Sequence, residues 1–160
     1  MAELLKNYGP LGILWFDGEW ESPWTVERGQ DLYRHCRALQ DSLIINNRVG
    51  KGREGMAGTT AQTVENPSDY DTPEQTIGKF QDQRPWETCM TICNQWAWKP
   101  NDEMKSLQEC LHALIRCAGG DGNLLFNVGP MPTGEIESRQ IGRLQEMGAW
   151  LAKNGESIYG

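Results

Sequence analysis

The chain has 160 residues, of which 38% are hydrophobic, and 15 Lys and Arg against 22 Asp and Glu give it a formal net charge of −7. This length suits one domain, and the balance of hydrophobic and charged residues excludes a disordered tail. The acidic excess argues against nucleic acid as a partner, because proteins that follow phosphates carry a basic surplus. No apolar run approaches the roughly 18 residues of a membrane-spanning helix, so we expect no membrane partner either.

The first residues have the pattern of a helix end. Residues 1–8 are followed by Gly9 and Pro10, which terminate helices. They lack the charged and apolar regions of a signal peptide, so the sequence leaves the cellular location open. A chain that opens on the end of a helix is expected to be the later part of something longer.

Short apolar runs and helical stripes alternate along the chain. Runs of strand length lie at residues 13–16, 43–45, 88–92 and 123–128. Three sets of apolar residues recur at helical spacing: Leu32, Cys36 and Leu39, weakened by Gly29; Met104, Leu107, Leu111, Leu114 and Ala118; and Ile141, Leu144, Met147 and Leu151. We expect Asp102 to cap the second helix and Gly119-Gly120 to end it.

This alternation predicts an α/β fold with a parallel sheet and crossover helices. Each predicted strand ends in polar residues or glycines, and in such folds the carboxyl ends of the strands carry the site. Four βα units cannot close a barrel, since eight need about 250 residues. The leading helix end favours a partial (β/α)8 barrel of the TIM type, and an open four-stranded sheet is the alternative.

The five cysteines do not form a disulfide framework, because one of them must stay unpaired. Cys89 and Cys93 lie in one predicted strand, and Cys110 and Cys117 are two helical turns apart, so neither pair meets the distance of a bridge. No spacing indicates a zinc site. We expect the thiols to be buried small hydrophobic side chains.

The first candidate for chemistry is Asp17, which follows the apolar run Ile-Leu-Trp-Phe. Strand alternation places Trp15 and Asp17 on one face, so the carboxylate projects inward at the end of the strand. Arg48 ends the next strand and could keep this carboxylate ionised by pairing with it. Taken alone, an Asp-Gly pair is more often a turn, and Arg48 could form a structural ion pair.

Two further carboxylates belong to the region between the second and third predicted strands and to the entry of the third. Glu74 lies in a long segment rich in Gly, Thr, Asn and Pro, and Glu87 precedes residues 88–92. Trp96 follows that strand. Two carboxylates and an aromatic wall suit glycoside hydrolysis, in which one carboxylate attacks and the other protonates the leaving oxygen.

These residues belong to blocks that resemble the α-L-fucosidases of glycoside hydrolase family 29. The blocks follow in the family's order and cover nearly the whole chain. The first is Asn-Tyr-Gly-Pro at 7–10 leading into Leu-Trp-Phe-Asp-Gly-Glu at 14–19, and the others are Asp-Thr-Pro-Glu-Gln at 71–75 and residues 86–92, 119–130 and 148–160. A single Asp-Gly or Thr-Pro-Glu would mean little, but five ordered blocks are a specific signal.

The resemblance implies retaining hydrolysis of terminal α-L-fucose from a fucosylated glycan or fucoside, through a covalent glycosyl-enzyme. Asp17 matches the nucleophile and Glu74 the acid/base, on a mobile loop, with Glu87 as the alternative acid at the opposite end of its strand. Arg48, Trp96, Trp15 and Glu87 are the candidate substrate-binding residues. No metal and no organic cofactor are implied.

The resemblance also implies that residues 1–160 form a single partial catalytic domain, the later half of the barrel. The family's front strands and its C-terminal β-sandwich have no counterpart in the sequence. We therefore expect a homo-oligomer or a complementing half-barrel as a partner. The alternative is a non-catalytic remnant that binds sugar or self-associates through unpaired strand edges.

Overall fold

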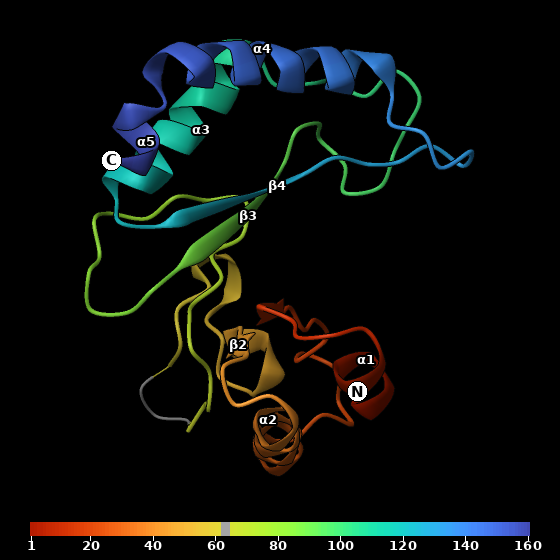
Figure 1. The fold of residues 1–160 in the computed structure, drawn as a ribbon, viewed down its shortest axis with the longest axis vertical. Coiled ribbons are helices and arrows are strands. Elements are labelled where there is room, and N and C mark those ends of the chain that lie inside the picture. The colour runs from red at the N-terminus through yellow and green to blue at the C-terminus, as the bar shows by residue number, and fades with distance from the viewer. Residues whose placement is uncertain (62–64) are drawn as a thin grey trace. The chain divides into compact units, whose positions relative to one another are not determined.

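The computed structural model describes residues 1–61 and 65–160. Contacts group the chain into two compact units, which are drawn in Figure 1. Unit 1 comprises Met1–Pro73 and Gln83–Trp86, and unit 2 comprises Glu74–Asp82 and Glu87–Gly160. Each unit has its own buried core.

Unit 1 is built on a short parallel pair of strands, β1 (Ile13–Leu14) and β2 (Ile44–Ile45). The remaining elements are the helices α1 (Ala2–Asn7) and α2 (Val26–Leu39) and the 3-10 turns η1 (Asn47–Val49) and η2 (Gly55–Ala57). α1 ends before Gly9 and Pro10, as the sequence predicts. The buried core consists of Leu5, Leu14, Cys36, Leu43, Ile45 and Val49.

Gly29 lets α2 approach η1 closely. A Cβ atom at position 29 would lie 2.6 Å from the carbonyl oxygen of Val49 and 2.8 Å from the Cα of Gly50. Both are backbone atoms and cannot turn aside. The glycine that weakens the sequence pattern of this helix is therefore a packing requirement.

Unit 2 is a βαβ unit followed by two helices. β3 (Glu87–Thr91) leads through α3 (Leu107–Gly119) to β4 (Asn123–Asn127), which pairs with β3 in parallel over five residues. α4 (Ser138–Asn154) and α5 (Glu156–Tyr159) complete the chain, and Figure 1 shows α3 and α4 on the same side of the β3–β4 pair. Ile92, Cys93, Cys110 and Met147 form the buried core.

Ser106, and not Asp102, caps α3. The Ser106 hydroxyl accepts the Glu109 N–H, and the Glu109 carboxylate accepts the Ser106 N–H at 2.7 Å, which completes a capping box. The expectation for Asp102 is wrong because its carboxylate bonds to the segment before α3. There it accepts hydrogen bonds from the backbone N–H groups of Gln95 and Glu103. Gly119 and Gly120 do end the helix.

The strands form two two-stranded parallel sheets, and not the open four-stranded sheet that was the alternative to a partial barrel. The described residues show an α/β fold and no barrel. Residues 70–74, which no apolar run marks, are extended as well. In unit 1, Tyr70 bridges to Asn46 and Asp71 to Trp86, and in unit 2, Glu74 bridges to Cys89, all in parallel.

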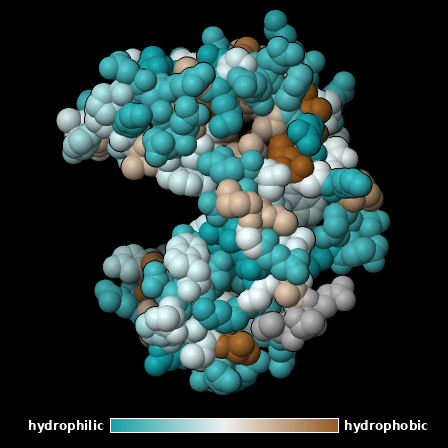
Figure 2. All heavy atoms as spheres, turned by 180° about the vertical axis from the view of Figure 1, so that it is seen from behind, coloured by the Kyte–Doolittle hydropathy of each residue, from teal (hydrophilic) through white to brown (hydrophobic). Residues whose placement is uncertain are grey.

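The surface of α4 differs from the sequence pattern. Met147 is buried, but Ile141 and Leu144 of the same predicted stripe are exposed. On the face drawn in Figure 2, hydrophobic side chains form small patches within a mainly hydrophilic surface. All five cysteines are free and buried, which confirms the expectation for the thiols. Among the described helices, none has the length and apolar character to cross a membrane.

Candidate active site

Asp17 and Arg48 form an ion pair at the carboxyl ends of β1 and β2. Arg48 Nη1 donates to Asp17 Oδ1 at 2.7 Å, and the two side chains differ sharply in burial, with 2% of Arg48 and 51% of Asp17 exposed. The pairing that the sequence suggests is therefore present. The guanidinium group of Arg48 is permanently charged and buried, and it holds the carboxylate of Asp17 at a position where that carboxylate is accessible to solvent.

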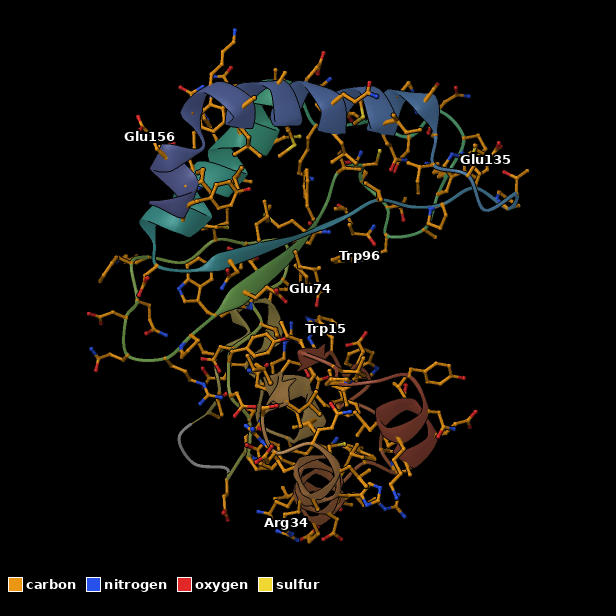
Figure 3. The ribbon with its side chains drawn as sticks, viewed as in Figure 1. Trp15, Arg34, Glu74, Trp96, Glu135 and Glu156 are labelled. Atoms are coloured by element: carbon orange, nitrogen blue, oxygen red, sulfur yellow. The ribbon has the colours of Figure 1, made fainter. Side chains whose placement is uncertain are left out.

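Trp15 packs against the same arginine. The guanidinium carbon of Arg48 lies 4.5 Å from the centre of the Trp15 ring, within the range of a cation–π interaction. The Trp15 indole N–H is buried without a hydrogen-bond partner among the described residues. Trp15, Asp17 and Arg48 thus form one contact group, which we call the Asp17 cluster, and Figure 3 labels Trp15 beside β1.

A second carboxylate–arginine pair lies next to the first. Glu19 is 7% exposed, and its Oε1 lies 3.4 Å from Arg53 Nη1. Its other oxygen, Oε2, is buried with no partner among the described residues. Neither the apolar pattern nor the charge pattern of the sequence predicts a site role for Glu19 or Arg53. The sequence feature that could have indicated Glu19 is the glycine of the Asp-Gly-Glu motif. Gly18 has a φ of +103°, a conformation that favours glycine, and it turns the chain between the two carboxylates.

The backbone of Glu74 is paired in a β-bridge, whereas the sequence predicts a loop at this position. It bridges to Cys89 of β3, and the next residue, Gln75, donates its N–H to the Cys89 carbonyl at 2.9 Å. The Gln75 side chain is also bonded to Thr91 through both its amide nitrogen and its amide oxygen. The backbone of Glu74 is thereby fixed against the middle of β3.

Glu87 is the first residue of β3, opposite Asn123 of β4. It borders a cavity of about 490 Å³ at the amino ends of these strands, which is also lined by Leu114, Cys117, Asp121, Ile158 and Tyr159. Glu74 pairs two residues further along β3. Within unit 2, the two candidate acids therefore occupy different levels of one strand, with Glu87 at the amino end as the sequence predicts.

Trp96 follows the carboxyl end of β3. Its side chain is exposed, and its carbonyl oxygen accepts a hydrogen bond from the Asn127 side chain at 2.9 Å, so the last residue of β4 fixes its backbone. Figure 3 labels Trp96 and Glu74 beside β3 and β4. An exposed indole on a fixed backbone is suited to packing against a sugar ring.

The nearby thiol of Cys93 is no nucleophile in this setting. Burial raises the pKa of Cys93, and the negative charge of Asp102 acts in the same direction, so the thiol stays protonated near neutral pH. No cluster of three His, Cys, Asp or Glu among the described residues could bind a metal ion.

The predicted site residues divide between the two units. Trp15, Asp17 and Arg48 lie together in unit 1, and Glu74, Glu87 and Trp96 belong to unit 2. The contacts establish the Asp17 cluster, and the catalytic roles assigned to these residues stay predictions.

The comparisons with known proteins agree on one family. The sequence model described as Alpha-L-fucosidase matches residues 1–156. An alpha-L-fucosidase of Branchiostoma floridae is 32% identical over 172 residues, covering 99% of this chain and 35% of the relative. A putative alpha-L-fucosidase of Caenorhabditis elegans is 29% identical and is covered to 33%. The chain thus spans about a third of the curated relatives it matches.

Solved structures of the same enzymes share the fold. Alpha-L-fucosidase isoenzyme 1 from Paenibacillus thiaminolyticus matches with a TM-score of 0.84 and 34% identity, over 99% of this chain and 38% of that protein. A family 29 alpha-L-fucosidase from Bacteroides thetaiotaomicron also gives a TM-score of 0.84, over 98% of this chain and 38% of that one, at 22% identity. The second match supports the fold alone.

Proposed function

Since the chain belongs to the alpha-L-fucosidase family, we propose that it is the part of an α-L-fucosidase that carries the nucleophile and the acid/base. The observation that carries the proposal is the Asp17–Arg48 ion pair at the carboxyl end of β1, in a chain that matches the family over nearly its whole length. The substrate class is a fucosylated glycan or a simple fucoside.

The proposed reaction is retaining hydrolysis. One Asp17 oxygen attacks the anomeric carbon of fucose while the acid protonates the departing oxygen, which gives a covalent glycosyl-enzyme and a free alcohol. Water then attacks the same carbon, the acid residue takes a proton from it, and the Asp17 carboxylate is released. Half of the Asp17 side chain is exposed, as attack on an incoming sugar requires.

Glu74 is the proposed acid/base. The bridge to Cys89 and the bonds of Gln75 fix its backbone, and a proton donor needs such positioning.

The remaining candidate residues are proposed to hold the nucleophile and the sugar. Arg48 holds Asp17 in place through their ion pair, and the exposed Trp96 is proposed to pack on the methyl face of the sugar. Trp15 supports Arg48 from the ring side, and Glu87 remains the alternative acid or a substrate-binding residue.

The fold proposed for the intact enzyme is a (β/α)8 barrel, to which residues 1–160 contribute about four βα units as one partial catalytic domain. The parallel pairs β1–β2 and β3–β4, whose strands are connected by α2 and α3 respectively, support this proposal. Its partner would be a complementing half-barrel or a second copy of the chain.

The decisive experiment is hydrolysis of an aryl α-L-fucoside by the 160-residue chain, with its mass measured in the same buffer. Release of fucose that first appears as the α-anomer supports a retaining fucosidase. First release of the β-anomer would contradict the retaining mechanism. Absence of hydrolysis by every assembly present would contradict catalysis by this chain.

Exposed apolar residues on the strands favour a second candidate function, a non-catalytic half-barrel that binds sugar or self-associates. Ile13 of β1, Ile44 of β2 and Leu125 of β4 are exposed, although parallel sheets are usually covered on both faces. We expect a dimer or larger assembly by light scattering at micromolar concentration, which Leu125→Glu dissociates. Ile141→Glu is the matched control, since Ile141 on α4 is 41% and Leu125 42% exposed. A compact wild-type monomer would contradict self-association.

A further inference from the structure

We infer that Thr72 is a positioning residue for the proposed nucleophile, acting on Asp17 through Arg48. This inference rests on the proposed function for its catalytic meaning, while the geometry lies wholly within unit 1. Thr72 comes from the Asp-Thr-Pro-Glu block, two residues before Glu74, and its side chain is completely buried.

The Thr72 hydroxyl both donates and accepts a hydrogen bond. It donates to the side-chain oxygen of Asn47 at 2.8 Å, and it accepts the Nε–H of Arg48 at 3.0 Å. Because the hydroxyl has a single proton, donation to Asn47 leaves a lone pair directed to Arg48. The direction of this bond is thereby fixed, and serine can reproduce it whereas valine cannot.

The backbone of Thr72 is fixed as well. Its N–H donates to the Gly58 carbonyl at 3.2 Å, and the Asn47 side-chain nitrogen donates to the same carbonyl at 2.7 Å. Gly58 has a φ of +67°, and a Cβ at this position would lie 2.0 Å from the Thr72 carbonyl oxygen. Only glycine permits this close approach of residue 58 to the Thr72 backbone, and the contact restricts the position of the Thr72 backbone.

Thr72 thereby fixes the orientation of Arg48. A guanidinium group is planar, so a hydrogen bond at Nε determines the direction in which Nη1 points. In this structure Nη1 points to Asp17 Oδ1 at 2.7 Å. Loss of the Thr72 hydroxyl would leave the Arg48 Nε–H buried without this acceptor, and the guanidinium would turn to find another.

The second ion pair reaches the same residue. Arg53 Nε donates to the Thr72 carbonyl at 3.3 Å, and Arg53 Nη1 faces Glu19. The two carboxylates that flank Gly18 are therefore both connected to Thr72, one through its hydroxyl and one through its backbone. This double connection fixes the segment that carries the nucleophile.

The test compares Thr72→Val with Thr72→Ser by the solvent exchange of the Arg48 Nε–H in side-chain NMR spectra, with the signal assigned by its loss in Arg48→Lys. We expect exchange to accelerate at least about tenfold in the valine variant and to stay within about threefold in the serine variant. Thr88→Val is the control, because Thr88 is equally buried and its hydroxyl donates only to a backbone carbonyl, that of Thr76. Equal exchange in the valine and serine variants would overturn the inference, as would acceleration in the control.

Kinetics supply the second readout. For an active protein, Thr72→Val should lower kcat about 10- to 100-fold with KM changed less than about threefold, since a small displacement of a reacting group costs rate and not ground-state binding. Thr72→Ser should restore most of kcat. If Thr72→Val does not fold, Thr72→Ala takes its place in both measurements. If the wild type hydrolyses no fucoside, the proposed function fails, and the exchange comparison still decides on Thr72.

Discussion

Phe16 and Asn46 exchange two hydrogen bonds through the side-chain amide of Asn46. The Phe16 N–H donates to Asn46 Oδ1 at 3.0 Å, and Asn46 Nδ2 donates to the Phe16 carbonyl at 2.9 Å. The amide thus replaces the backbone of a neighbouring strand just where β1 stops pairing. Because Phe16 directly precedes Asp17, this pair of bonds fixes the backbone from which the proposed nucleophile projects.

The first prediction concerns Asp17 itself. Asp17→Gly should reduce hydrolysis of an aryl fucoside by several orders of magnitude, because no carboxylate is left to attack the sugar carbon. Added azide should partly restore turnover by entering the space of the missing side chain. Product formation followed by NMR would identify a fucosyl azide. Asp31→Ala, an exposed carboxylate on α2, should keep wild-type activity. Near-normal hydrolysis by Asp17→Gly would exclude the assignment.

The second prediction separates the two candidate acids. Glu74→Ala should slow a fucoside with a sugar leaving group far more than one with an activated aryl group, because only the poor leaving group needs protonation. Glu87→Ala, at the amino end of β3, should slow both substrates to a similar extent. The ratio of kcat/KM for the two substrates is the measured quantity. The reverse pattern would make Glu87 the acid.

The third prediction compares two helical glycines. Gly29→Ala should lower the free energy of unfolding by about 2 kcal/mol, because the new methyl group collides with the backbone of Val49 and Gly50. Gly142→Ala should raise it by about 0.5–1 kcal/mol, since Gly142 of α4 has nothing within 4 Å and alanine favours the helix. Urea unfolding of both variants measures the difference. Changes of the same sign would contradict the close approach of α2 to η1.

The fourth prediction tests the cap of α3. Ser106→Ala should cost about 1 kcal/mol of stability, because it removes the acceptor for the Glu109 N–H. Ser138→Ala is the control, since Ser138 is exposed and lies in the first turn of α4, where no side-chain cap is formed. The bonds from Ser106 lower the pKa of Glu109, so this part of the stability is present above the ordinary carboxyl pKa and disappears as the pH falls through the lowered one. Equal unfolding midpoints for the two variants would refute the cap.

The fifth prediction is a pH dependence in the alkaline range. Burial raises the pKa of the Cys117 thiol from 9.0 to about 11, against the opposing charge of Arg116. The neutral thiol is favoured in the fold, so its contribution is complete below about pH 9 and is lost as the pH rises toward 11. The loss is on the order of 2 kcal/mol. Unfolding free energies at pH 8 and pH 11 should therefore differ less in Cys117→Ala than in the wild type. An identical difference in the two proteins would contradict this role of the thiol.

The helices were the most predictable elements. The periodic apolar residues of α2 and α3 placed both helices correctly, and Gly119 and Gly120 marked the end of α3. The cap of α3 was misassigned to Asp102, because an aspartate and a serine four residues later are equivalent signals until the turn between them is known. In the apolar stripe of α4, Met147 is buried but Ile141 and Leu144 are exposed, since periodicity reveals a face and not what covers it.

The strands and the site were predictable only in part. β1 pairs over two residues and not four, because the side chain of Asn46 bonds Phe16 in place of a backbone, and no hydrophobic pattern encodes such a substitution. Residues 70–74 were missed because aspartate and proline, here Asp71 and Pro73, are depleted in strands. The Asp17–Arg48 pair was foreseen from two strand ends. Glu19, Arg53 and Thr72 were not, since their contacts depend on the turn at Gly18 and on the close approach of Gly58.

The distribution of the buried thiols makes the chain a reporter of its own local opening. Cys36 is the single cysteine of unit 1, while Cys89, Cys93, Cys110 and Cys117 all belong to unit 2. An alkylating reagent reaches a buried sulfur only when the surrounding structure opens, so the labelling rate of each cysteine measures the free energy of that opening. Mass spectrometry of the labelled peptides would then read the two units separately in one sample. It would show whether they unfold in a single cooperative transition or one after the other.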